Sequence, residues 1–160
     1  MTTRTAPAPR PAPGPAEPAT TALSAPSRWE RRVPLGRAGA VYDLVVTVGF
    51  ATPWTAAALL DLQRAAHAAL GLPGIPTPAF GPVELMFTAM MGTAVTMWAL
   101  ARIRYPFASL IAIDTGGRVA FSAWMVTALL TGASPVVLGF LAFEVLWGIL
   151  QGIGVARALR

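Results

Sequence analysis

The segment "SPVVLGFLAFEVLWGILQGIGVA" (residues 134–156) decides the fold, because it is long enough to cross a bilayer and carries one charged residue, Glu144. A transmembrane helix needs about 20 predominantly apolar residues. Three more apolar segments precede it, in a chain of 160 residues that is 55% hydrophobic and 12% charged. The sequence therefore predicts an all-α, polytopic membrane protein with four transmembrane helices.

Three of these spans have one predicted position each, and the third along the chain has two. The first span is expected to kink at Pro53, because proline removes a backbone donor and clashes with the preceding turn. A short amphipathic helix and a loop rich in proline and glycine are expected to follow it. The predicted spans are residues 38–60, 82–101, 107–131 or 115–133, and 135–156.

Residues 1–37 differ in composition from the rest of the chain. The stretch "TAPAPRPAPGPAEPAT" (residues 5–20) alternates proline with small residues, so its backbone favours extended polyproline conformations and it has little to bury. We therefore expect a disordered cytoplasmic tail rich in proline, alanine and arginine. The four-helix transmembrane domain is expected over residues 38–160.

All twelve basic residues are arginines, and their positions predict the orientation in the membrane. Ten lie in the tail, in the link after the second span or at the C-terminus, and only Arg64 lies on the opposite side. The positive-inside rule then places both termini in the cytoplasm, in a multi-pass protein of the cell membrane. Because topology accounts for the net charge of +5, the expected partner is the lipid bilayer and no nucleic acid is expected.

Cysteine is absent and His67 is the single histidine, which excludes thiolate sites and histidine-rich metal sites. The chain also lacks a glycine-rich phosphate loop and a nucleophile elbow. We therefore predict neither a metal nor a cofactor.

The stretch "IDTGGRVAF" (residues 113–121) allows two interpretations of the third span. In the longer one, Asp114 and Arg118 share a helix face, and Arg118 lies about 16 Å into the helix, at a depth where it can pair with Glu144. In the shorter one, Asp114 caps the helix and Arg118 lies near the headgroups. The shorter interpretation is favoured, because two adjacent glycines are poor inside a helix but acceptable at its entry.

Five charged or amide side chains lie inside the predicted spans, beyond the first turn of each: Asp43, Asp114, Arg118, Glu144 and Gln151. Each of them costs free energy in the apolar interior of a membrane. Three are acids and Arg118 is the one base, so at least one acid is expected to lack a permanent partner and to be able to donate a proton. Glu144 and Asp43 are the candidate catalytic groups; the alternative for Glu144 is a structural contact between helices. The candidate substrate-binding residues are Arg118, Asp114, Trp147, Gln151 and Trp98.

Four spans, an amphipathic link after the first and arginines after the second form a layout similar to that of the DoxX-like small bacterial inner-membrane proteins. The resemblance covers about residues 38–158 and rests on this layout. It implies a four-helix inner-membrane protein that is a partner of redox enzymes or of membrane complexes.

Three functions are compatible with these features, and the sequence fits an enzyme as well as a non-catalytic protein. The first is a polar intramembrane site for a lipophilic small molecule, with acid–base chemistry by Glu144 as an option. The second is a non-catalytic subunit or scaffold of a redox or biosynthetic membrane complex, bound to another membrane protein or to a second copy of itself. The third, a small proton-coupled exporter, is disfavoured because Asp43 lies at the cytoplasmic end of the first span and not at its centre.

Overall fold

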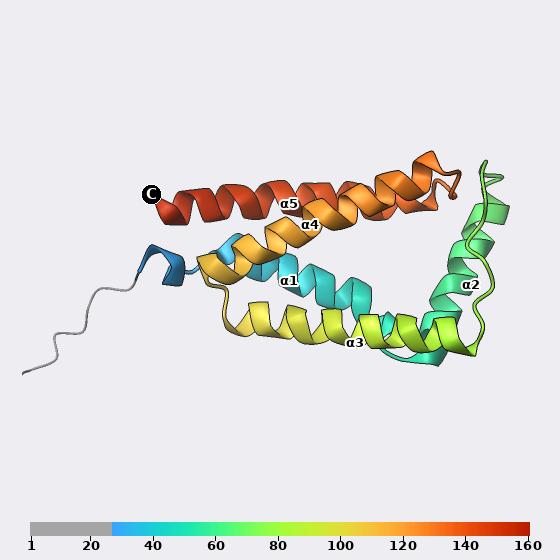
Figure 1. Ribbon diagram of the computed structural model, residues 1–160, viewed down its shortest axis with the longest axis horizontal. Coiled ribbons are helices and arrows are strands. Elements are labelled where there is room, and N and C mark those ends of the chain that lie inside the picture. The colour runs from blue at the N-terminus through green and yellow to red at the C-terminus, as the bar shows by residue number, and fades with distance from the viewer. Residues whose placement is uncertain (1–26) are drawn as a thin grey trace, which may run out of the picture.

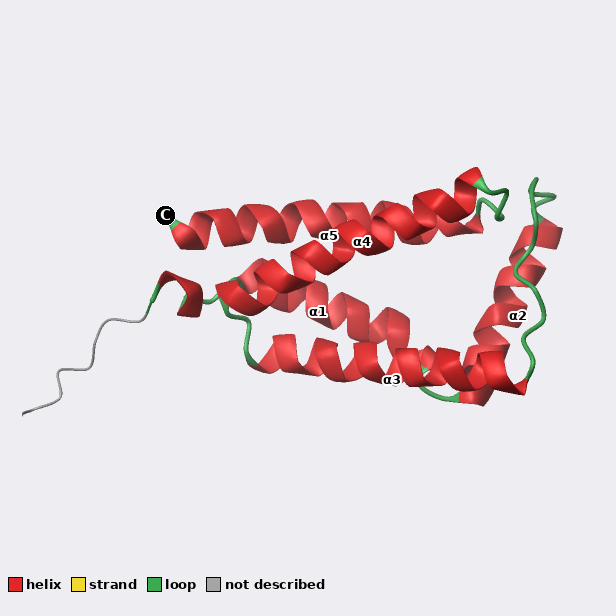
Figure 2. Cartoon of the chain, viewed as in Figure 1, coloured by secondary structure: helices red, strands yellow, loops and turns green. Residues whose placement is uncertain are grey.

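A computed structural model describes residues 27–160 of the chain, and in this part the secondary structure is helical (Figure 2). Most of the predicted tail, residues 1–26, lies outside the described residues. The elements are η1 (Arg28–Glu30), α1 (Pro34–Thr47), η2 (Val48–Phe50), α2 (Pro53–Ala69), α3 (Pro82–Arg104), α4 (Ala108–Leu130) and α5 (Val136–Leu159).

The long helices are arranged in two packed pairs joined by α1 (Figure 1). Helix α4 lies along α5, while α1 lies along α3 and also contacts α5. The backbones of α3 and α4, which follow each other in the chain, approach each other closely at few points or none. Helix α2 crosses the far end of the molecule, opposite the C-terminus (Figure 1). The backbones of α3 and α4 therefore stay apart along most of their length.

The first predicted span is broken and not merely kinked. The axis of the α1–η2 segment and that of α2 differ by 99° across the break after Phe50. Thr52 caps α2 by accepting a hydrogen bond from the backbone N–H of Thr55 at 3.3 Å, and Pro53 occupies the first helical turn, where its missing N–H costs nothing. The prediction of one helix over residues 38–60 was therefore wrong, because the proline starts a new helix that continues through the expected amphipathic segment.

The third long helix follows the longer of the two interpretations. Helix α4 begins at Ala108, so Asp114 lies two turns inside it and is not its cap, and the favoured shorter interpretation was wrong. The physical reason is tertiary packing of the first turn. Ala108 donates its backbone N–H to Arg31 at 2.9 Å, and Ile111 is completely buried in a small core that includes Val33.

The ordered structure also begins earlier than residue 38. Val33 is buried, α1 starts at Pro34, and the Val33 N–H donates to the carbonyl of Pro106 at 2.7 Å. The side chains of Arg28 and Arg31 donate to the last carbonyls of α5, at 3.2 Å and 3.0 Å. Cations are favourable at a helix C-terminus, so these arginines attach the start of the described chain to its end. The predicted boundary at residue 37 is corrected accordingly.

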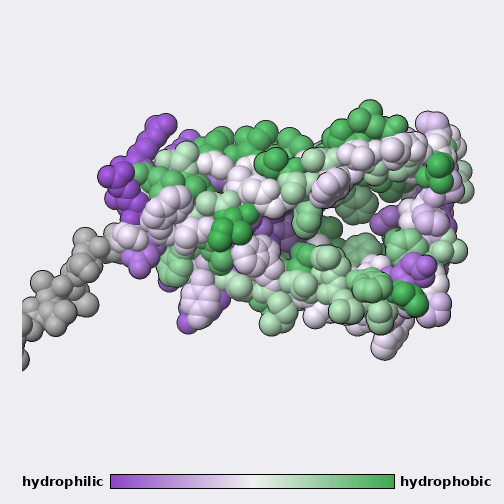
Figure 3. All heavy atoms as spheres, viewed as in Figure 1, coloured by the Kyte–Doolittle hydropathy of each residue, from purple (hydrophilic) through white to green (hydrophobic). Residues whose placement is uncertain are grey.

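Two of the helices, α3 and α5, are long and apolar enough to cross a membrane, and the bent pair of α1–η2 with α2 makes a third if it is counted as one span. Helix α4 is as long as α3 but contains Asp114 and Arg118. Large apolar side chains cover the outer faces of the bundle, so that much of the surface in Figure 3 is hydrophobic. A chain with such a surface is suited to a lipid environment.

Candidate functional site

Five charged side chains meet in the interior of the bundle, which we call the ionic cluster. They come from four helices: Asp43 from α1, Arg102 from α3, Asp114 and Arg118 from α4, and Glu144 from α5. The continuous helix α4 explains part of the arrangement, because Asp114 and Arg118 are four residues apart and therefore lie on one face. The other three charged residues reach that face because α1, α3 and α5 pack around it.

Two arginines and two aspartates of the cluster form a closed, charge-balanced group. Asp43 Oδ2 accepts hydrogen bonds from Arg102 Nη2 at 2.7 Å and from Arg118 Nη2. Asp114 Oδ2 accepts from Arg102 Nη1 at 2.5 Å and lies 3.3 Å from Arg118 Nε. Each aspartate thus contacts both guanidinium groups, a geometry that compensates for the cost of burying all four charges.

Glu144 is attached to this group at its edge. Its Oε2 accepts a hydrogen bond from Arg118 Nη1 at 3.0 Å, and Arg118 is its one ionic partner among the described residues. Its side chain is 14% exposed, the largest value among the three carboxylates. Arg118 thus contacts both Glu144 and Asp114, the two pairs that the longer interpretation of the third span allowed.

Three uncharged candidates surround the cluster. The indole N–H of Trp98 donates to Asp114 Oδ1 at 2.8 Å, and Gln151 Oε1 accepts from Arg118 Nε at 3.1 Å. Trp147 does not contact the charges but packs against Tyr42, with ring centroids 5.7 Å apart. Its indole N–H and the amide nitrogen of Gln151 are buried without a hydrogen-bond partner among the described residues.

Arg102 is the one residue of the ionic cluster that was not among the candidates predicted from the sequence. It was assigned to the cytoplasmic link, but its side chain is 1% exposed and it bonds to both aspartates. The expectation that one acid would lack a partner was therefore wrong, since each carboxylate contacts an arginine. The sequence contained one indication that Arg102 lies near the site. Trp98, a candidate site residue, is four residues before Arg102, so a helix that continues past residue 101 puts both side chains on one face. The guanidinium carbon of Arg102 indeed lies 5.8 Å from the centre of the Trp98 ring.

A hollow of about 470 Å³ adjoins the ionic cluster, and we call it the charged chamber. All five charged residues of the cluster line it, and Tyr42, Trp98 and Phe121 contribute aromatic walls. The space-filling view is hollowed between the α3 side and the α4–α5 side, with hydrophilic atoms visible inside (Figure 3).

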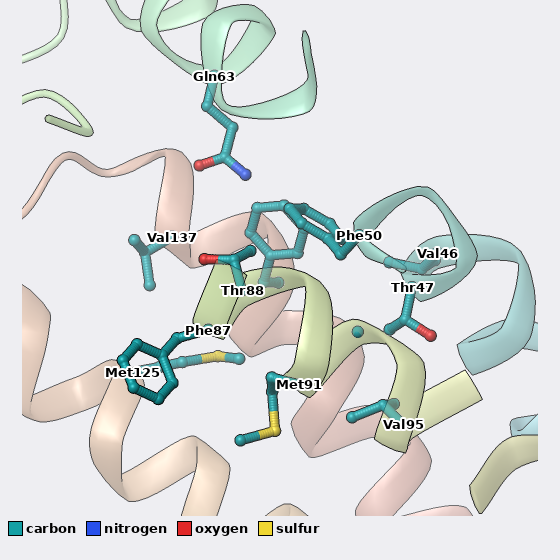
Figure 4. A pocket seen from close by; sticks show the side chains of 12 residues that line it. Val46, Thr47, Phe50, Gln63, Phe87, Thr88, Met91, Val95, Met125 and Val137 are labelled. Carbon is teal, nitrogen blue, oxygen red and sulfur yellow. The ribbon is translucent and has the colours of Figure 1, made fainter. Parts of the chain in front are cut away.

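A second hollow of about 590 Å³, the apolar chamber, lies toward α2 and is lined mainly by apolar side chains. Figure 4 shows Phe87, Met91, Met125 and Val137 directed toward it from α3, α4 and α5, with Gln63 of α2 at its far side. The two chambers are adjacent, because five residues line both of them: Val46, Thr47, Val95, Met125 and Phe140. The two chambers are therefore neighbours in the bundle, one lined by the ionic cluster and the other mainly by apolar side chains.

The polar groups that line the charged chamber include carboxylates, guanidinium groups and an indole N–H, which form hydrogen bonds and ion pairs. Within residues 27–160, no three acidic or histidine side chains are placed to hold a metal ion. His67 lies apart from the cluster, where its Nδ1 is 2.8 Å from the hydroxyl of Ser134. No family model, curated protein or solved structure matches the chain. The resemblance to DoxX-like proteins accordingly stays a prediction from layout.

Proposed function

We propose that this protein crosses the membrane four times and binds a lipophilic small molecule in the cavity between α3 and α4. The four crossing segments are α1–η2, α3, α4 and α5, and α2 lies near the membrane surface. The polar head of the ligand faces the ionic cluster, and its apolar body occupies the apolar chamber.

The distribution of arginines supports the four-span topology with both termini in the cytoplasm. Contacts of Val33 with Pro106 and of Arg28 with Leu159 bring the start of the described chain, the α3–α4 link and the C-terminus to one end. Seven exposed arginines lie in these segments, whereas α2 at the other end carries Arg64, which is paired with Asp61. Such an asymmetry is what the positive-inside rule associates with the cytoplasmic side. The exposed arginines are Arg28, Arg31, Arg32, Arg37, Arg104, Arg157 and Arg160.

The observation that carries the ligand proposal is that the charged chamber and the apolar chamber adjoin each other and share five lining residues. Ligand sites are typically concave and mostly apolar, with a few polar groups that orient the bound molecule. We expect such a ligand to enter sideways from the bilayer between α3 and α4, because the backbones of these two helices approach each other closely at few points or none. Glu144, at the edge of the ionic cluster, is the group placed to exchange a proton with the head of the ligand.

The proposal is tested by purifying the protein in a mild detergent and analysing the extracted small molecules by mass spectrometry. Met91→Trp fills the apolar chamber, whereas Met97→Trp adds the same ring to the same helix outside it; the two methionines are 61% and 62% exposed. We expect a lipophilic compound with the wild type and with Met97→Trp, and at least about tenfold less with Met91→Trp.

Equal amounts of compound in both tryptophan variants would contradict the proposal. Val137→Trp enters the same chamber from α5 and provides a second filled variant, in case Met91→Trp does not fold. Size-exclusion chromatography of each variant checks that the comparison is made on folded protein.

A further inference from the structure

The ionic cluster contains one more carboxylate than guanidinium. The two aspartates and two arginines balance one another, so with all groups ionised Glu144 leaves a formal charge of −1. The chain provides no third cation near it: among the described residues the ion pairs of this region involve Arg102 and Arg118 alone.

An unbalanced carboxylate within a membrane bundle is unfavourable, because lipid and protein solvate charge poorly. Either a proton or an external cation must therefore neutralise Glu144. The arrangement of the cavity favours access for an external cation, since Glu144 lines the charged chamber and its Oε1 makes no hydrogen bond to the described residues. An ammonium group bound in this chamber would neutralise the Glu144 carboxylate in place of the proton.

The walls of the charged chamber are also suited to a cation. Tyr42, Trp98 and Phe121 line it from α1, α3 and α4, and the faces of aromatic rings attract positive charge. Tyr42 is held in place by stacking on Phe143, with ring centroids 5.3 Å apart. The two arginines would attract an anionic head and repel an ammonium ion, but the charges of the two aspartates that they contact offset both effects.

From this charge balance we propose that the ligand is a lipophilic amine, whose ammonium head binds Glu144 while its hydrocarbon part extends into the apolar chamber. The inference rests on the proposed function and adds the charge of the ligand to it. Binding of the ammonium ion replaces the proton that neutralises Glu144 in the empty cavity.

Three probes with the same hydrocarbon chain and different heads test the proposal: decylamine, decanol and decanoic acid. Their binding to the purified full-length protein is measured by equilibrium dialysis at pH 8, with protein-free micelles of the same detergent as the reference. We expect the amine to bind at least about tenfold more tightly than the alcohol, and the acid to bind most weakly. In Glu144→Gln the advantage of the amine over the alcohol disappears while the alcohol still binds.

Glu84→Gln is the matched control, because Glu84 is an exposed acid in the first turn of α3 and lies outside both chambers. It should leave all three affinities unchanged. The order of the probes on the wild-type protein is itself a test if Glu144→Gln does not fold.

Two kinds of failure are distinguishable. Equal binding of amine and alcohol, or tighter binding of the acid, would overturn the assignment of a cationic head and leave the lipophilic site intact. If no probe binds to the wild type more than to Met91→Trp, the cavity is not a ligand site and both proposals fall.

Discussion

At the scale of single residues, Arg118 is the side chain that contacts all three carboxylates of the ionic cluster. Its guanidinium group contacts Asp43, Asp114 and Glu144, and its Nε also donates to Gln151. The planar fork of arginine has five donors, so one side chain can serve partners from three helices at once. Removing it would leave carboxylates buried beside a single remaining arginine.

Replacement of Arg118 by methionine should strongly destabilise the fold. Breaking a buried ionic network by removing one partner costs about 3–5 kcal/mol, because the remaining charges are left uncompensated. Arg157→Met on the exposed end of α5 is the control and should change stability by no more than about 0.5 kcal/mol. Thermal unfolding in detergent, followed by circular dichroism, measures both. Equal melting temperatures would show that the cluster does not hold the helices together.

At the scale of the helices, the close approach of η2 to α3 determines the position of the sharp turn after α1. A Cβ atom on Gly92 would collide with the backbone of Phe50, so glycine is required where these two backbones meet. The turn sends α2 across the end of the bundle, and Phe50 and Gln63 thereby reach the apolar chamber. Helix α4, by contrast, contains Gly116 at a position with open space around it.

Alanine substitutions at these two glycines should have opposite effects. Alanine is favoured over glycine inside a helix by about 1 kcal/mol, so Gly116→Ala should keep or raise the melting temperature. Gly92→Ala should lower it, because the collision with the Phe50 backbone costs about 1–3 kcal/mol and exceeds that gain. The two variants are compared by thermal unfolding in the same detergent. A Gly92→Ala protein as stable as the wild type would mean that η2 does not pack against α3 this closely.

At the scale of the whole molecule, the two ends of the bundle are built differently. One end joins the start of the described chain, the α3–α4 link and the C-terminus. At the other end, the loop after α2 is attached to the α4–α5 turn, where Ile75 donates to Gly132 at 2.8 Å and Ser134 donates to Ile75 at 2.9 Å. Exposed arginines are concentrated at the first of these ends.

Reporter fusions should therefore detect opposite sides of the membrane at these ends. A periplasmic reporter such as alkaline phosphatase should be active when fused after Gly81 and inactive after Arg104 or Arg160. In the proposed topology the charge asymmetry orients the bundle, and α3 crosses the membrane between the first two of these positions. The same activity after Gly81 and after Arg104 would contradict the proposed topology.

The helical class and the apolar segments were determined by the sequence itself, because hydrophobicity and the scarcity of charge are local properties. The spacing of Asp114 and Arg118 allowed them to pair if one helix contained both, but the sequence did not decide that it would. The charges within apolar segments also indicated where a polar site should be sought.

Only the tertiary structure decided where α4 begins, that Pro53 starts a separate helix, and that Arg102 lies in the ionic cluster. Local preferences favoured a helix start after Asp114, but burial of Ile111 against Val33 stabilises the earlier turn. Arg102 is near the end of a helix and looked like a cytoplasmic charge; two aspartates from other helices hold it inside. The cavity likewise exists because α3 and α4 pack on different neighbours, and packing between distant segments cannot be read from the spacing of residues along one helix.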